Sequence, residues 1–474
     1  MMRLVAFALV AGCNIPVVHF TGAGGDGGDD MDGPSVDAGP PGSYVWLRSL
    51  SQVQTQTITA GASGIMTPGY LYSSANLDGT NTLTSAGNAD QVIASFAEAD
   101  GANLFAVRHG DVGSEFGLLG LVASNGLELV SGVTEGDKTI DLGLGPVTGG
   151  GTPVEDGYIG TYANGVADWV QRIVGPGSDK FLGMARGPGS TIYGAGWFEQ
   201  SPTFNGGTLT SVGGRDIIVA RFSLFGGAVD LMKQYGGTGR DEVSGGGIAT
   251  LISDPSTFVM AGFFDDTINF GGTSTPITAS HGGLDAWIAK FDNNGVGIWA
   301  VTYGGPGEDR DISVVLDPQG DVYIAGSFTT SIAFGAKTLT SVGGVDHFIA
   351  KLEGTDGSPV WAISFGSAAD EHAGRLAVDD KGHLAFSGAM SGAFDGMPTL
   401  GGQDAYIAEF KTSDGSLIWQ KLFSTAADDG GSGVVYGTTT GDLFASVGTG
   451  LPYDFGAPII GDPNPLDVLI RIVP

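Results

Sequence analysis

The sequence predicts an all-β protein, and within that class a seven-bladed β-propeller of four-stranded blades. From residue 44 onward, runs of β-branched and aromatic residues alternate with clusters of Asn, Asp, Gly and Pro, and no useful helical periodicity interrupts them. The segment DAWIAKF at residues 285–291 returns as DHFIAKL at 346–352, DAYIAEF at 404–410 and DIIVARF at 216–222. A repeat of about 60 residues that carries four strands is typical of a propeller blade.

Two landmarks each occur seven times and give the number of blades. Fainter copies of the Asp-led segment begin at Asp90, Asp156 and Asp467, which brings that landmark to seven. A bulky apolar residue heads the next strand about 14 residues after six of these Asp residues, and Trp46 is a seventh such residue near the start of the repeats. The seven are Trp46, Phe105, Trp169, Leu231, Trp299, Trp361 and Trp419. These residues are 59, 64, 62, 68, 62 and 58 positions apart, so the blade count does not depend on one residue type.

Each unit is expected to run through four strands in a fixed order. An inner strand such as 312–316 leads through a tight turn into a second strand such as 321–328. A loop of about 15 residues follows, then the Asp-led third strand and the outer strand that carries the bulky residue. The runs are apolar on both faces, as expected for sheets that stack on either side.

The two ends of the repeat region complement each other. Residues 44–50 match an outer strand with no third strand before it, and residues 467–474 match a third strand with no outer strand after it. A propeller is commonly closed by a blade built from both termini, because the pairing removes the open sheet edges. We therefore expect six continuous blades and one composite blade, all within residues 44–474.

The first 43 residues read differently. Residues 1–12 hold a minimal basic start and a short apolar run, and Val10, Ala11 and Gly12 precede Cys13, which is the single cysteine. This resembles the signal peptide and lipobox of bacterial lipoproteins, in which the chain is cut before a cysteine that then carries lipid. Residues 13–43, rich in Gly, Asp and Pro, are expected to be a lipidated, disordered tether.

Composition narrows the range of partners. A net charge of −31 argues against nucleic acid, which needs a basic surface. One cysteine excludes an intramolecular disulfide and a CxxC metal site. The 474 residues would fit two or three ordinary domains, but the repeat indicates one ring, which we expect to be monomeric.

Acidic residues recur at two places in the unit and are the candidate site residues. One set begins the third strands: Asp90, Asp156, Asp216, Asp285, Asp346, Asp404 and Asp467. The other lies between an outer strand and the next inner strand: Asp179, Asp241, Asp309, Asp370 and Asp428, with Glu115 as the nearest equivalent in its unit. By strand order both sets lie on the same rim, where each acid either caps a turn or joins a ring of carboxylates that binds a cation such as calcium.

No catalytic motif stands out. The six histidines show no metal-ligand spacing, and no nucleophile elbow, P-loop or dinucleotide fingerprint occurs in a convincing context. We therefore expect no resident cofactor or metal, apart from the calcium alternative.

Two family resemblances follow from the repeat. The segments GGLDAWIAKF at 282–291, YGGPGED at 303–309 and LDPQGDVYIAG at 316–326 resemble the bacterial SBBP-type β-propeller repeat of secreted and envelope proteins, over essentially residues 44–474. The segments TDGSPVW at 355–361 and TSDGSLIW at 412–419 resemble the tryptophan motif of pyrroloquinoline-quinone enzymes and their non-catalytic relatives, which include an outer-membrane lipoprotein scaffold. Those enzymes commonly add vicinal cysteines, which this chain lacks, so the second resemblance implies blade structure rather than quinone chemistry.

These observations predict a lipid-anchored, non-catalytic propeller of the cell envelope, an outer-membrane lipoprotein that binds or scaffolds an envelope protein or polysaccharide. The ligand is expected on the rim formed by the long second-to-third strand loops, around Phe204, Phe270, Phe334 and Phe394. The alternative is a hydrolase or lyase that acts on polysaccharide through rim carboxylates.

Overall fold

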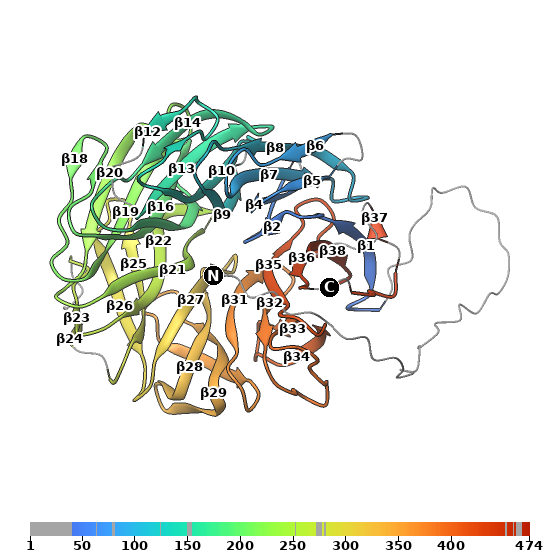
Figure 1. The fold of residues 1–474 in the computed structure, drawn as a ribbon. Helices are drawn as coiled ribbons and strands as arrows, with labels where there is room; N and C mark the ends of the chain where they lie inside the picture. The colour runs from blue at the N-terminus through green and yellow to red at the C-terminus, as the bar shows by residue number, and fades with distance from the viewer. Residues whose placement is uncertain are drawn as a thin grey trace. The chain divides into compact units, whose positions relative to one another are not determined.

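The computed structural model describes residues 40–474 except 63, 78–80, 124, 149–153, 252, 272–276, 279–280, 451–452, 458 and 461–466. The predicted signal peptide, Cys13 and the tether up to residue 39 lie outside the described residues. Residues 39–474 form one compact unit. Within the described part of that unit there is no helix, and seven sheets of four or five strands form a ring (Figure 1), which confirms the predicted seven-bladed β-propeller.

Each blade presents its strands in order from the channel outward. The innermost strands are β2 (Gln54–Thr55), β9 (Glu115–Val122), β15 (Asp179–Arg186), β21 (Asp241–Leu251), β27 (Asp309–Leu316), β31 (His372–Val378) and β35 (Gly430–Tyr436). The second strands are β4 (Gly64–Leu71), β10 (Glu128–Glu135), β16 (Thr191–Glu199), β22 (Asp254–Phe264), β28 (Val322–Phe334), β32 (His383–Met390) and β36 (Leu443–Gly448).

The third and outer strands complete the blades. The third strands are β7 (Asp90–Phe96), β13 (Glu155–Ala163), β19 (Arg215–Ser223), β25 (Asp285–Asp292), β29 (Lys337–Leu352), β33 (Asp404–Lys411) and β38 (Asp467–Ile472). The outer strands are β1 (Tyr44–Ser49), β8 (Asn103–His109), β14 (Val166–Arg172), β20 (Val229–Tyr235), β26 (Gly297–Tyr303), β30 (Pro359–Phe365) and β34 (Leu417–Phe423). All pairings between these strands are antiparallel.

Short strands decorate the loops. β3 (Thr59–Gly61) pairs with β4, and β37 (Ile459–Ile460) lies parallel to β1. Small hairpins occupy the second-to-third strand loops: β5 (Ser74–Asn76) with β6 (Thr82–Thr84), β11 (Thr139–Ile140) with β12 (Val147–Thr148), β17 (Thr203–Phe204) with β18 (Gly207–Thr208), and β23 (Thr267–Ile268) with β24 (Ile277–Thr278). In the β27–β30 blade the same hairpin is formed by the long β28 and β29 themselves.

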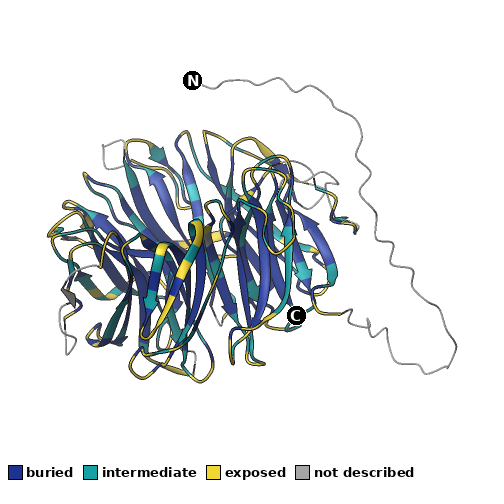
Figure 2. Ribbon diagram, turned by 90° about the horizontal axis from the view of Figure 1, so that it is seen from below, coloured by how far each residue is buried: buried dark blue, intermediate teal, exposed yellow. Residues whose placement is uncertain are grey.

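The hydrophobic core lies between neighbouring blades. In β25, Ile288 and Ala289 are adjacent and both fully buried, because the two faces of the sheet pack on different blades. Ile288 packs in a cluster that includes Ile324 of the following blade, whereas Ala289 packs in one that includes Val219 of the preceding blade. Figure 2 shows the buried strands as a continuous layer, with the exposed residues mostly in the loops.

The seven bulky landmarks all lie on outer strands, as predicted, and four of the tryptophans fasten one blade to the next. The indole N–H donates to a backbone oxygen in the third-to-outer strand turn of the following blade: Trp46 to Glu98 (3.0 Å), Trp169 to Leu224 (3.0 Å), Trp299 to Gly354 (3.3 Å) and Trp361 to Thr412 (3.1 Å). A glycine of that turn packs against the indole ring of the tryptophan. At Gly357, which has a positive φ of 76°, an added Cβ would lie 2.9 Å from the Trp299 ring, so the turn requires glycine for two reasons.

The ring is closed by the predicted composite blade, with strand order β35, β36, β38 and β1. β1 pairs antiparallel with β38, so that Leu47 lies opposite Ile470. Ahead of β1, the N–H of Gly42 donates to the carbonyl of Val473 (2.8 Å), and the N–H of Val473 donates to Ser43 (2.9 Å). Residues 40–43 thus replace the missing turn, and Gly42 lies on Trp419 as the turn glycines lie on the other tryptophans.

A polar clasp joins the composite blade to the first blade. The carboxylate of Glu98 accepts the backbone N–H groups of Thr438, Thr439 and Thr440 at 2.9–3.1 Å. In return, Arg471 donates to the carbonyls of Glu98 (3.0 Å) and Ala99 (2.7 Å). Charge-assisted bonds to backbone groups are the stronger kind, so the clasp stabilises the junction between the composite blade and the first blade.

Among the described residues, no helix is long and apolar enough to cross a membrane.

Candidate functional site: paired carboxyl groups at the blade junctions

The two recurrent sets of acids meet across the boundaries between blades. The third-strand acid opens β7, β25, β33 or β38, or lies within β13, β19 or β29. The second-set acid lies where the next innermost strand begins. Strand direction places both on one rim, as predicted, and we call it the carboxyl rim. Six junctions carry a pair: Asp90 with Glu115, Asp156 with Asp179, Asp216 with Asp241, Asp285 with Asp309, Asp346 with Glu371, and Asp404 with Asp429.

Two of the predicted second-set residues are shifted by one position. Asp370 and Asp428 are exposed and accept the backbone N–H groups of Val345 (3.0 Å) and Gln403 (3.2 Å), whereas the adjacent Glu371 and Asp429 are buried and complete the pairs. The prediction took the first acid of an Asp-Glu and an Asp-Asp dipeptide. A constant offset from the last aromatic residue of the outer strand would have corrected it, since six positions separate Tyr303 from Asp309 and Phe365 from Glu371.

Five of the third-strand acids have turn-capping geometry, which is one of the two roles that the sequence left open. One oxygen accepts the backbone N–H of the residue four positions earlier: Ala86 to Asp90, Val212 to Asp216, His281 to Asp285, Val342 to Asp346, and Leu400 to Asp404. In the second set, Asp241 and Asp309 cap Gly237 (2.7 Å) and Gly305 (3.0 Å) in the same way. Each acid therefore fixes the loop that leads into its own strand.

Burial raises the pKa of the second-set acids. Loss of water, followed by the charge of Asp216, raises the pKa of Asp241 to about 7. Burial and the neighbouring Asp285 raise the pKa of Asp309 to about 8. Burial is again the main cause at Glu115 and Asp179, whose pKa values rise to about 8 with Asp90 and Asp156 as the respective neighbours. Two close carboxylates out of water cannot both be ionised at little cost.

Glycine backbone covers the pairs. A Cβ built on Gly304 would lie 2.2 Å from Oδ1 of Asp285. A Cβ on Gly236 would lie 2.8 Å from Oδ1 of Asp216 and 3.1 Å from Oδ2 of Asp241, so both carboxyl groups converge on this glycine. The pairs are thus closed inside the junction, and Asp216, Asp241, Asp285 and Asp309 are all fully buried.

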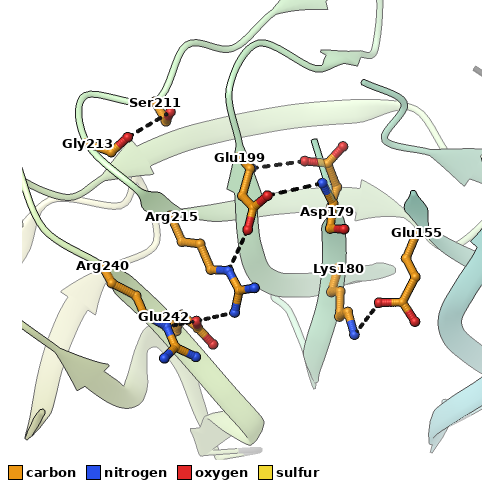
Figure 3. A network of polar contacts seen from close by, with 10 residues as sticks. Glu155, Asp179, Lys180, Glu199, Ser211, Gly213, Arg215, Arg240 and Glu242 are labelled. Carbon is orange, nitrogen blue, oxygen red and sulfur yellow. Dashed lines mark hydrogen bonds and ion pairs between the residues drawn. The ribbon is translucent and has the colours of Figure 1, made fainter. Parts of the chain in front are cut away.

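A charged network surrounds the pair member Asp179 (Figure 3). The backbone N–H of Glu199 donates to Oδ1 of Asp179 (3.2 Å), and the Glu199 carboxylate meets Arg215 (2.7 Å). Arg215 also binds Glu242 (2.5 Å), and its guanidinium carbon lies 3.9 Å from the centre of the Trp197 ring. The remaining ion pairs join Lys180 to Glu155 and Arg240 to Glu242. Every basic group drawn in Figure 3 is thus matched by an acid on the same rim.

The composite blade carries the third-strand acid without a second-set partner. Asp467 is buried, and burial raises its pKa to about 8. β2, the innermost strand that follows this junction, reads Gln54–Thr55 and offers no carboxyl group.

The phenylalanines of the long loops do not form an open ligand surface. Phe204, Phe270 and Phe334 are 1–2% exposed and Phe394 is half-buried, and each packs in a core cluster between blades. An aromatic side chain on a loop gains more from burial than from exposure, so these residues anchor the loops to the blades. The ligand surface that the sequence placed around them is therefore not built from their rings.

Among the described residues, the histidines show no metal-site geometry. His347 is buried in β29, where its Nε2 lies 3.1 Å from the carbonyl of Ala389, and burial lowers its pKa to about 4. His383 pairs with Asp379 at 2.8 Å. In the part of the chain that the structure describes, no three His, Cys, Asp or Glu side chains gather as a metal site would require.

The opposite rim carries a different feature. There, the ends of the innermost strands enclose a cavity of about 430 Å³ at the opening of the central channel, which we call the apolar funnel. Every blade contributes to its wall: Ile58, Leu121, Met184, Ile248, Val315, Leu376 and Val435. Polar side chains such as Arg186, Tyr436 and Thr438 lie among them.

Comparison with known proteins gives distant likenesses. No protein-family model matches the sequence. The regulatory protein FlaEY of Caulobacter vibrioides (strain ATCC 19089 / CIP 103742 / CB 15) is 23% identical over 438 residues, which cover 89% of this chain and 45% of FlaEY. The chain therefore spans less than half the length of this curated relative.

Solved structures resemble the chain at low identity. BamB from Moraxella catarrhalis is 11% identical with a TM-score of 0.40, covering 91% of this chain and 99% of BamB. The Dos1 propeller is 10% identical with a TM-score of 0.44, covering 90% and 94%. Quinohemoprotein alcohol dehydrogenase from Comamonas testosteroni is 9% identical with a TM-score of 0.41, covering 91% and 76%.

Replacing the covering glycine tests how tightly the junction is packed. Gly304→Ala is expected to lower the free energy of unfolding by roughly 1–3 kcal/mol, because the new methyl group overlaps the Asp285 carboxyl group. Urea unfolding followed by tryptophan fluorescence measures the change. Gly430→Ala is the matched control, since a Cβ there meets no atom within 4 Å. Equal stability of the two variants would contradict the packing described here.

Proposed function

We propose that this chain is a non-catalytic binding or scaffold module of the cell envelope, lipid-anchored through Cys13, which engages an envelope protein through the apolar funnel. The observation that carries the proposal is the funnel itself. Six innermost strands, together with Ile58 and Ala60 of the first blade, bring apolar side chains to one opening. Concave apolar surfaces with a few polar groups are the usual form of a binding site.

The partner that fits this surface is an apolar segment of a protein. Of the funnel residues named above, Leu121, Met184, Val315 and Val435 are only partly buried, so a ligand can reach them from the channel opening. Tyr436 is the one aromatic side chain among the funnel-lining residues that the structure describes, whereas sugar recognition usually relies on several aromatic faces. Protein therefore stands ahead of polysaccharide as the ligand class.

The alternative of a polysaccharide hydrolase or lyase receives limited support from the carboxyl rim. A glycosidase needs two carboxyl groups that face a substrate cleft, one of them with a raised pKa. The junction pairs supply the raised pKa, but they are buried and glycine backbone covers them. Their recurrence at six junctions favours a structural role over a single active site.

The envelope location is inferred from sequence alone. The run Val10-Ala11-Gly12-Cys13 after a short apolar segment resembles a lipobox, and the repeat resembles the SBBP type of secreted and envelope proteins. A diacylglycerol on Cys13, together with an acyl chain, would hold the protein stably at a membrane surface. In lipoproteins of Gram-negative envelopes, the absence of Asp directly after the lipidated cysteine usually implies the outer membrane. Cys13 is followed by Asn14, so we assign the protein to the outer membrane.

The funnel proposal is tested by crosslinked pull-down of the full chain from its own envelope fraction. The double variant Met184→Glu and Val315→Asp places two charges in the apolar wall and is expected to reduce recovery of the wild-type partner at least tenfold. Val342→Asp is the control, since Val342 is 74% exposed and lies on the opposite rim. Equal recovery with all three proteins, each shown to be folded by circular dichroism, would contradict the proposal.

The anchor has its own test. Cys13→Ser removes the thiol that would carry the lipid, so we expect the variant to incorporate no labelled fatty acid and to leave the membrane fraction. Incorporation of label into the wild type alone supports the anchor. A wild-type protein that takes up no label would rule it out.

A further inference from the structure

The junction pairs contain carboxyl oxygens that have no hydrogen-bond partner. At four junctions a buried oxygen on each side is left without one: Asp90 Oδ1 with both oxygens of Glu115, Asp216 Oδ1 with Asp241 Oδ1, Asp285 Oδ1 with Asp309 Oδ1, and Asp346 Oδ1 with Glu371 Oε2. A buried carboxylate oxygen without a donor is costly, and most buried polar atoms in proteins have a partner. The same deficit at four equivalent places needs one common explanation.

Neighbouring charged groups do not compensate the buried acids of the Asp216–Asp241 junction. The charged groups that act on Asp241 are acids, namely Asp216, Asp265 and Asp266. Asp216 accepts from the neutral Gln234 (2.8 Å) and from the backbone N–H of Val212 (3.1 Å). The two nearby arginines, Arg215 and Arg240, are engaged with Glu199 and Glu242.

The other junctions give the same balance of charge. At Asp285 the ionisable neighbour is His281, which is 61% exposed and whose Nδ1 lies 3.1 Å from Oδ2. Arg108 and Arg172 bind Asp90 and Asp156, but each junction still holds two acids and one base. Each of these four pairs therefore carries at least one negative charge more than its surroundings balance, unless a proton or a cation is bound.

A proton fits the space better than a metal ion. Calcium takes six to eight oxygen ligands at about 2.3–2.6 Å, and no group of three or more acidic, His or Cys ligands is found in the described part of the chain. Glycine backbone also packs directly on the carboxyl groups, at the point where a Cβ on Gly304 would overlap Asp285. A proton needs no added volume, and it turns one orphaned oxygen into a donor for the other.

We propose that four of the seven blade junctions, those of Asp90, Asp216, Asp285 and Asp346, are each closed by one shared proton, held between the third-strand acid of one blade and the acid at the start of the next innermost strand. The Asp216–Asp241 pair shows the arrangement most directly, because both carboxyl groups converge on Gly236, where an added Cβ would lie 2.8 Å from Oδ1 of Asp216 and 3.1 Å from Oδ2 of Asp241. The ring thus carries a set of proton-binding sites that couple its stability to pH.

The direction of the pH effect follows from the raised pKa values. An aspartate has a pKa near 3.9 in the unfolded chain, whereas in the folded ring the pKa is about 7 at Asp241 and about 8 at Asp309. Between these limits folding takes up protons, so stability is greatest at low pH within the window and falls as the pH rises towards 8. Each such acid increases the unfolding equilibrium constant by up to about tenfold per pH unit.

The Asp241→Asn variant distinguishes a bound proton from a bound cation. An asparagine amide donates permanently to Asp216 and still accepts from Gly237, so it mimics the protonated acid. The unfolding equilibrium constant is measured by urea unfolding from pH 5 to 9. Between pH 5 and 7, we expect its increase with pH to be smaller in the variant than in the wild type, by up to about tenfold per pH unit. At pH 8 the variant should be more stable than the wild type. Asp254→Asn, at an exposed position outside the junctions, should keep the full dependence.

The outcomes decide between the two ligands. A variant that is destabilised by the same factor at every pH, or a wild type that gains stability from calcium chloride and loses it to a chelator, would overturn the proposal. Infrared spectroscopy provides a check that does not depend on the variant folding. The wild type should show protonated carboxyl bands at pH 6 that disappear above pH 9, and their absence at pH 6 would also overturn it.

Discussion

A carboxyl group that leaves water must keep a proton or gain a compensating charge, and this constraint governs how the blades of the ring join. At six junctions two acids are buried together on one rim, and at five of these junctions a glycine packs against one or both carboxyl groups. They fix the loops that enter the third and innermost strands, so the register of each blade and its contact with the next blade depend on the same two side chains. The buried acids thus form directed hydrogen bonds to the loop backbone, which an apolar side chain at the same place could not form.

The opposite rim is fastened by different chemistry. Tryptophans of the outer strands donate to the turn of the next blade and lie under its glycine, which combines a large buried area with one directed hydrogen bond. At the junction between β34 and the composite blade only the packing is kept: Gly42 takes the place of the turn glycine on Trp419, whose indole N–H donates to Glu409 of its own blade (2.7 Å). Fastening at both rims leaves the innermost strands free to line a channel, whose apolar funnel is the surface we assign to binding.

Much of this architecture was predictable from sequence, because the repeat marks equivalent positions without reference to packing. The blade count, the composite blade, the outer-strand position of Trp299 and the shared rim of the two acid sets all follow from spacing. The register of Glu371 and Asp429 did not, since adjacent acids look alike until burial distinguishes them. Phe204 was expected at an exposed rim because it lies in a loop, whereas its ring is buried. The funnel was also missed, because it is formed by side chains from seven distant segments.

The central claim is that a proton joins the two acids of a junction. Neutron diffraction from a deuterium-exchanged crystal at pH 6 would test it most directly at Asp285 and Asp309, which lack a neighbouring arginine in the contacts described. The account predicts nuclear density for one deuteron between the two carboxyl groups, with one long C–O bond in the acid that carries it. Two symmetrical carboxylates around a bound metal ion or an ordered water molecule would contradict it.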